Sequence, residues 1–127
     1  MPRARDTQSG ALFEISGQVS NGSTWAEDIW FTEDGAAMDL TGLEFRLQLR
    51  CCRTDQIEQT LTTADRLSIV TDSISGIDRI LRITVPPSAM TQLSGDYFAD
   101  LASKDASNEI KHWGHGVISF INDPIEW

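Results

Sequence analysis

The residues best suited to catalysis or metal binding lie near the end of the chain, in the segment HWGHG at positions 112–116. Its two imidazoles would bind a metal ion such as zinc if a third ligand joined them. The preceding segment contains three carboxylates that could serve: Asp100, Asp105 and Glu109. In a regular strand, residues three apart point to opposite faces, so His112 and His115 could act together only if Gly114 kinked the backbone. We therefore expect no metal site, and we expect Gly114 and Gly116 to mark a bulge.

The rest of the sequence holds no recognisable catalytic pattern. No serine stands in a Gly-x-Ser-x-Gly turn, and no glycine-rich loop that would cradle a phosphate leads into a helical segment. An Asp-x-Asp-x-Asp calcium loop is also missing. We therefore predict that the protein is not an enzyme and that it uses no cofactor.

The two cysteines, Cys51 and Cys52, are adjacent, and the chain has no others. Neighbours in a strand point to opposite faces, and a bond between them would require a distorted peptide. We expect Cys51 in the core and Cys52 as a free surface thiol, with an intermolecular disulfide through Cys52 as the alternative.

Length and charge restrict the class of protein and its partners. A chain of 127 residues is suited to one domain with one core. DNA and anionic membranes would repel its formal charge of −9, and its arginines are spread over several segments. No apolar run approaches the roughly 20 residues of a membrane-spanning helix, and the polar N-terminus does not resemble a secretory signal. We expect neither nucleic acid nor membrane as a partner.

Both ends of the chain are candidates for contacts with other proteins. Residues 1–10 form a polar arm, in which Arg3 and Arg5 come before any acid. Such a basic arm could attach to a neighbouring acidic copy, while residues 11–127 form the folded domain. Trp127 is the last residue and has no following chain to cover it, so we expect it to dock on a neighbour.

Alternation of apolar and polar residues establishes the fold class. Over positions 43–51 every second residue is apolar, which is typical of a half-buried strand. Shorter strands are predicted at 11–20, 24–32, 57–61, 67–70, 79–85, 95–101 and 113–121, with a polar hairpin loop at 104–111. About seven short strands with turns between them are typical of an all-β, immunoglobulin-like antiparallel β-sandwich.

The tryptophans differ in the faces that this pattern gives them. Trp25 shares a face with Ile29 and Phe31, whereas Trp30 lies on the opposite face with Asp28, so one of the two tryptophans is a candidate for partial exposure. Trp30 is also a candidate for partner binding. Tryptophan is also common on sugar-binding platforms. A carbohydrate-binding module that uses Trp25, Trp30 or Trp113 is therefore an alternative function.

Structural roles are assigned to Gly42, Gly95, Gly116 and Tyr97. Gly42 ends a compact turn, and Gly95 begins a strand. Tyr97 is the only tyrosine and stands at the entry of the penultimate strand. In Greek-key sandwiches a tyrosine at that place buries its ring and bonds its hydroxyl to the backbone of the corner.

Three segments together carry a family resemblance. They are the opening 17–39 with Asp39-Leu-Thr-Gly before an arginine-bearing strand, the run Leu93-x-Gly95-x-Tyr97-x-x-Asp100-Leu101, and the closing Trp113-Gly-x-Gly116-x-Ile118. Their order and spacing resemble the small immunoglobulin-like virion structural proteins of tailed bacteriophages, and are similar to the N-terminal domain of phage baseplate upper proteins.

The resemblance implies a structural subunit of the virion, assembled in the host cytoplasm and held by contacts with other virion proteins in a symmetric assembly. The related baseplate proteins continue into long C-terminal regions, whereas this chain stops after one domain. We therefore expect an accessory or adaptor subunit of the tail, baseplate or neck. A capsid decoration protein is the nearest alternative.

Overall fold

The structure, a computed structural model, describes residues 3–8, 13–14 and 17–122, with side chains from residue 17 onward. These residues form eleven strands and a short 3-10 helix at Pro87–Ala89. The strands are β1 (Arg3–Gln8), β2 (Phe13–Glu14), β3 (Gly17–Ser20), β4 (Trp25–Glu33), β5 (Ala36–Ala37), β6 (Glu44–Cys51), β7 (Ile57–Thr62), β8 (Leu67–Val70), β9 (Ile80–Val85), β10 (Gly95–Lys104) and β11 (Ile110–Ile121). Within this part of the chain, no helix has the length and apolar character needed to span a membrane.

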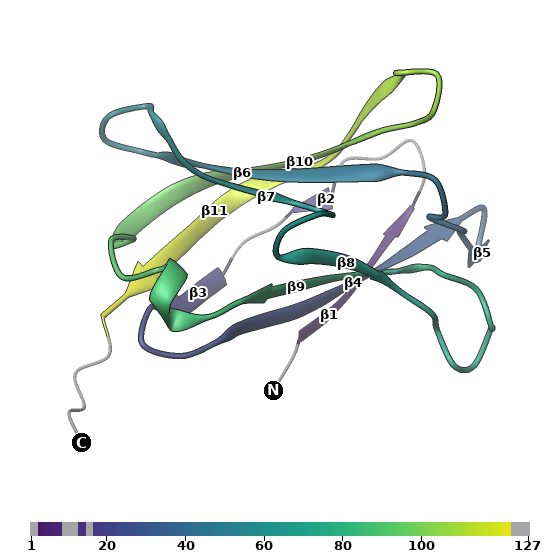
Figure 1. Ribbon diagram of the computed structural model, residues 1–127, viewed down its shortest axis with the longest axis horizontal. Helices are drawn as coiled ribbons and strands as arrows, with labels where there is room; N and C mark the ends of the chain where they lie inside the picture. The colour runs from purple at the N-terminus through teal and green to yellow at the C-terminus, as the bar shows by residue number, and fades with distance from the viewer. Residues whose placement is uncertain (1–2, 9–12, 15–16, 123–127) are drawn as a thin grey trace.

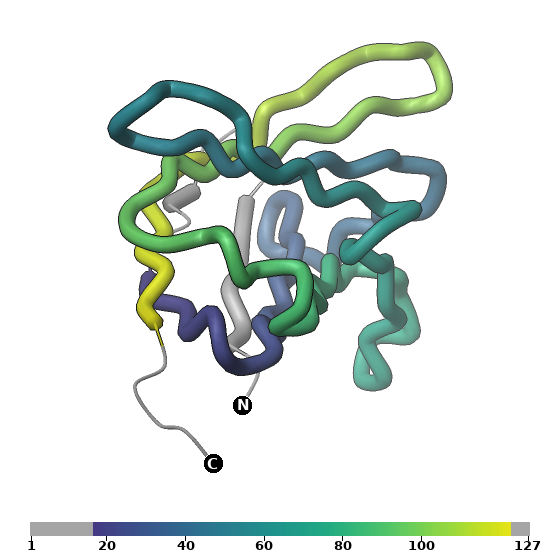
Figure 2. The backbone as a smooth tube through the Cα atoms, turned by 60° about the vertical axis from the view of Figure 1, so that its left-hand side comes forward, coloured from purple at the N-terminus to yellow at the C-terminus, as the bar shows by residue number. Residues whose placement is uncertain are grey.

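The strands pack as two layers, which confirms the expected all-β, immunoglobulin-like sandwich (Figure 1). One sheet has the order β1-β4-β9-β8, with β5 beside β4. The other has the order β2-β11-β10-β6-β7, with β3 also beside β11. Hairpin turns between β6 and β7, between β8 and β9, and between β10 and β11 project from the body (Figure 2).

The N-terminal strands pair in parallel, and the other strand pairings described are antiparallel. β1 runs parallel to β4 in the five-stranded sheet. β2 and β3 run parallel to β11 in the six-stranded sheet. The segment expected as a polar arm therefore contributes β1 to the edge of one sheet, and the next strands cover the edge of the other.

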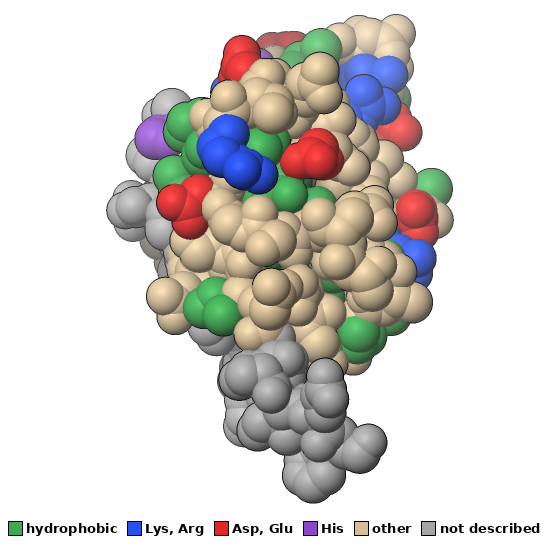
Figure 3. Space-filling view, turned by 90° about the vertical axis from the view of Figure 1, so that its left-hand side faces the viewer, with side chains coloured by type: hydrophobic (Ala, Val, Ile, Leu, Met, Phe, Trp, Pro, Cys, Tyr) green, Lys and Arg blue, Asp and Glu red, His purple; other side chains and the backbone are tan. Residues whose placement is uncertain are grey.

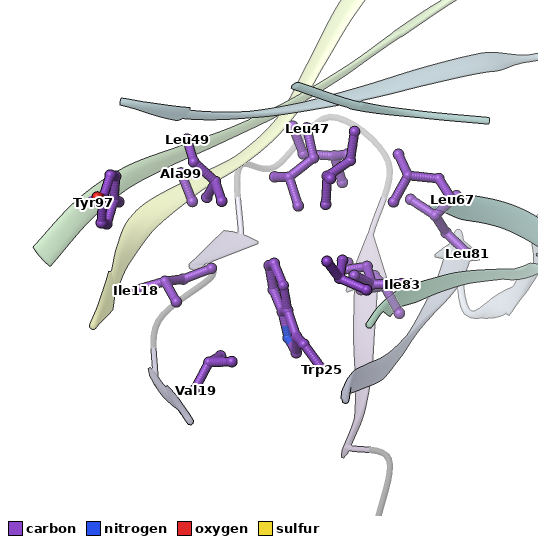
Figure 4. Packing of buried hydrophobic residues seen from close by; sticks show 14 of the residues in the cluster. Val19, Trp25, Leu47, Leu49, Leu67, Leu81, Ile83, Tyr97, Ala99 and Ile118 are labelled. Atoms are coloured by element: carbon purple, nitrogen blue, oxygen red, sulfur yellow. The ribbon is translucent and has the colours of Figure 1, made fainter. Parts of the chain in front are cut away.

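Apolar residues from both sheets meet between the layers and form one core. Leu47, Leu49 and Ala99 point inward from the six-stranded sheet toward Trp25 and the strands of the facing sheet (Figure 4). The predicted alternation in 43–51 is confirmed, because β6 has the burial pattern of a strand with one face in the core. Cys51 is buried, as expected, and Cys52, which follows the end of β6, is half-buried with a free thiol.

Aromatic pairs join the two sheets at two places in the core. Phe31 of β4 packs edge-on against Trp113 of β11, with 5.0 Å between ring centroids, and also contacts Phe45 of β6. Separately, Phe120 packs edge-on against both Trp25 and Tyr97. Edge-to-face pairs of this kind add to the hydrophobic contribution of the rings.

Candidate functional site

The terminal residues predicted to bind partners are only partly described. Arg3 and Arg5 lie in β1, where their backbones pair with Glu27 and Ile29 of β4. Their side chains, and the whole of Trp127, lie outside the described residues. The prediction that these residues contact neighbours therefore stays a prediction.

Trp30 lies on the outer face of the five-stranded sheet and is half-buried, whereas Trp25 is buried, so Trp30 is the one of the two tryptophans that is partly exposed. The guanidinium of Arg79 lies over its ring, 5.3 Å from the centroid. Arg79 is held there because its Nε donates to the Phe31 carbonyl at 3.1 Å and its Nη2 donates to Thr32 Oγ1 at 2.8 Å. Arg79 therefore covers part of the Trp30 ring, which reduces the area of the ring available to a partner.

The other two described tryptophans are core residues. Trp25 and Trp113 are 4% and 1% exposed. Neither ring is available for stacking on a sugar, so the carbohydrate interpretation loses two of its three platforms.

The two histidines are brought to the same side of β11 by a bulge. The register between β10 and β11 shifts, so that Leu101 pairs with Gly114 while Ala102 pairs with His112. Trp113 is the extra residue, and His112 and His115 are both exposed. The bulge is confirmed next to Gly114. Within the described ranges, no group of three or more His, Cys, Asp or Glu side chains is arranged to hold a metal ion.

The positions assigned structural roles lie at turns and in the core. Gly42 and Gly95 have φ values of +86° and +89°, which favour glycine strongly. A Cβ at either position would meet no atom within 4 Å, so the constraint there is the backbone conformation and not space. Gly116 pairs with Ala99 in the β10–β11 ladder. Tyr97 is buried, which raises the pKa of its phenol, and its hydroxyl accepts a long 3.4 Å contact from the Ser94 N–H.

Sequence reasoning missed the internal order of the β8–β9 turn. Asp72 is only 4% exposed, and its carboxylate accepts hydrogen bonds from the Ile74 N–H at 3.0 Å and from Ser75 Oγ at 2.9 Å. Nη1 of Arg79 lies 3.7 Å from Oδ2 of Asp72. The Ile74 N–H in particular lowers the pKa of Asp72 below its usual value. The result is an ordered turn that presents Ile74, which is 91% exposed.

Replacing Asp72 by asparagine should lower the melting temperature at neutral pH, because the hydrogen-bond donors of the turn stabilise the ionised carboxylate. The pKa is depressed on folding from an ordinary value of 3.8, so this stabilisation is complete above that value. It is lost as the pH falls through the lower pKa of the folded protein. The difference in melting temperature between the wild type and Asp72→Asn should therefore shrink in strong acid.

Differential scanning fluorimetry over a pH series would measure this difference. Asp34→Asn is the control, because Asp34 is exposed in another turn at a positive φ that asparagine also tolerates. If the difference in melting temperature between the wild type and Asp72→Asn stayed constant down to strong acid, the stabilising role of the ionised Asp72 carboxylate would be contradicted.

A groove of 350 Å³ crosses the outer face of the six-stranded sheet near the β10–β11 hairpin. The polar and apolar residues that line it include Glu44, Arg46, Gln48, Lys104, Ile110 and His112. Nζ of Lys104 lies 3.9 Å from Oε2 of Glu44, an exposed ion pair of little energetic weight. The lining combines β6 with the β10–β11 hairpin, which lies much later in the sequence, so no single local motif could have indicated the groove.

No family model and no curated protein matches the sequence. Among solved structures, the chain is similar to the N-terminal domain of phage TP901-1 ORF48, with a TM-score of 0.55 and 10% sequence identity. The match covers 96% of this chain and 98% of that chain, so the two domains have the same extent. At this identity the likeness is one of fold. The chain therefore has the fold of a domain that occurs in a phage protein.

Proposed function

We propose that this chain is a structural subunit of a tailed-bacteriophage particle, placed in the tail, baseplate or neck and acting through protein–protein contacts. The observation that carries the proposal is the end-to-end match with a domain of a phage protein. The sequence motifs around Asp39, Tyr97 and Trp113 favour the same group of proteins independently of that match. The subunit assembles in the host cytoplasm and remains in the virion, in copies related by the symmetry of the particle.

Quantitative mass spectrometry of purified particles tests the proposal. We expect the chain in the particles at a low copy number set by the symmetry of the tail. A copy number that follows the capsid lattice would instead make the chain a decoration protein. Absence from particles that are otherwise complete would refute a virion role.

Imaging then locates the subunit within the particle. Gold-labelled antibodies against the chain should bind the tail, baseplate or neck in negatively stained particles. Particles from a phage lacking the gene serve as the control for antibody specificity. Labels distributed over the head would contradict the proposed position.

A further inference from the structure

Four side chains form a continuous row on the outer face of the six-stranded sheet. Val117 of β11 pairs with Phe98 of β10, Phe98 pairs with Arg50 of β6, and Arg50 pairs with Ile57 of β7. Their chain neighbours Ile118, Ala99 and Leu49 are buried, so the row itself faces outward. We call Val117, Phe98, Arg50 and Ile57 the Phe98 row.

Three of the four residues in the row are apolar, and all three are exposed to solvent. Phe98 and Val117 are 39% and 38% exposed, and Ile57 is 55% exposed. Ile121, four residues after Val117 on the same strand, extends the area and is also exposed. Adjacent apolar residues that stay exposed in a folded domain are typical of an interaction surface.

Arg50 is held in place within the row. Its guanidinium carbon lies 5.6 Å from the centroid of the Phe98 ring. Its Nε lies 3.1 Å from Asp55 Oδ1, and its Nη2 lies 3.8 Å from Asp100 Oδ2. The 3.1 Å contact is an ion pair that lacks hydrogen-bond geometry. The cation is therefore committed to carboxylates of its own chain and keeps the Phe98 ring in a fixed position.

Acidic residues border the row. Asp96 and Asp100 lie two residues before and after Phe98, so all three share one face of β10. Asp55 lies in the β6–β7 turn beside Arg50. Asp55 and Asp100 both lie beside the Arg50 guanidinium, and Asp96 accepts a hydrogen bond from Ser119 Oγ. Figure 3, which looks onto the left-hand side of the molecule as drawn in Figure 1, shows hydrophobic and basic side chains together, with acidic side chains on either side.

We propose that the Phe98 row is a docking surface for a different protein, one that presents apolar side chains bordered by lysine or arginine. An apolar centre with a charged border is the usual anatomy of an interface, and opposite charges on the partner would complement the border. A second copy of this chain is disfavoured, because it would bring the same three carboxylates, on a chain of charge −9, against this face. The inference rests on the proposed function, and in a virion the partner is another structural protein.

Photo-crosslinking in assembled particles tests the surface. The photoreactive analogue p-benzoylphenylalanine replaces Phe98 in one sample, and Ile74 in a control that presents an apolar side chain from the β8–β9 turn. After irradiation, mass spectrometry identifies the crosslinked peptides. We expect the probe at position 98 to react with a non-identical virion protein, at a segment where lysine or arginine flanks apolar residues. The probe at position 74 should not reach that segment.

The outcomes separate the surface from the proposed function. A crosslink from position 98 to a second copy of this chain, or none while the chain is present in particles, would overturn the docking surface alone. Absence of the unmodified chain from particles would overturn both proposals.

Variants of the row give a second measurement. The double substitution Phe98→Thr with Val117→Thr keeps residues suited to a strand and should reduce the copies per particle by about tenfold or more relative to Ile74→Thr. Asp96→Lys with Asp100→Lys should reduce incorporation without changing the apolar area. Thermal unfolding of each purified variant shows whether it is folded. Normal incorporation of both folded double variants would contradict the proposal.

Discussion

Replacing Trp113 by alanine is expected to lower the free energy of unfolding by about 3–5 kcal/mol. Its ring is 1% exposed and packs edge-on against Phe31, with 5.0 Å between centroids. Its indole N–H donates to Ser103 Oγ at 2.8 Å. The variant loses the aromatic contact and leaves a cavity between the sheets, and it also removes the donor from a buried hydroxyl. Urea unfolding followed by far-ultraviolet circular dichroism would measure the change.

The substitution Trp113→Phe separates the two contributions. A phenyl ring keeps part of the packing against Phe31 but cannot donate to Ser103, so we expect a smaller loss of about 1–3 kcal/mol. Equal losses for the alanine and phenylalanine variants would show that the ring contact contributes little. A loss below about 1 kcal/mol for Trp113→Ala would contradict its placement in the core.

Replacing Phe120 by alanine is expected to cost a similar amount, about 3–5 kcal/mol. Phe120 is 2% exposed and lies edge-on to two rings, Trp25 at 5.8 Å and Tyr97 at 5.4 Å. These contacts tie the end of β11 to β10 and to the facing sheet. Loss of the ring should therefore loosen the surroundings of Trp25, and the intrinsic tryptophan fluorescence should report this in the same denaturant titration.

The control is Phe120→Leu, which retains most of the apolar volume and removes only the aromatic geometry. We expect about 1–2 kcal/mol for this variant. The aromatic contact of Trp113 and the two aromatic contacts of Phe120 share no ring, so the losses of unfolding free energy from milder variants at the two positions should add. If the loss for the double variant differed from the sum of the single losses by well over about 0.5 kcal/mol, the two ends of the core would act as one unit.

The strand pattern could be predicted because burial of one face imposes a two-residue period. Segment 43–51 and the faces of Trp25 and Trp30 follow directly from that rule. Strand length was harder to predict. The loop expected at 104–111 is shorter, because Lys104 and Ile110 pair through their backbones, and backbone pairing leaves no mark on the apolar pattern.

Features that depend on tertiary context were outside the reach of the sequence. Glu27 is 1% exposed at an inward position of β4, where the pattern favours an apolar residue. The β8–β9 turn is a different case, because the bonds of Asp72 to Ile74 and Ser75 span only two and three residues. Asp and Ser at this spacing are a local signal that could have indicated an ordered turn.

Exposed residues also divide into those that a single strand predicts and those that depend on how strands pair. Strand parity placed Trp25 and Trp30 on opposite faces, but it left open which of the two is partly exposed. The Phe98 row could not be predicted, because its residues come from four strands and become neighbours only through their register. Within β10 alone, Phe98 is a single apolar residue between Asp96 and Asp100 on the outer face of the strand.

The parallel pairing of β3 with β11 has a consequence for the nascent chain. The partners Gly17 and Ile118 are among the first and last parts of the domain to be synthesised. A contact this distant along the chain forms slowly and cannot form before β11 has been translated. Until then β10 has an unpaired edge on the ribosome, and protection from aggregation at this stage depends on the charged residues of that strand, such as Asp96 and Asp100.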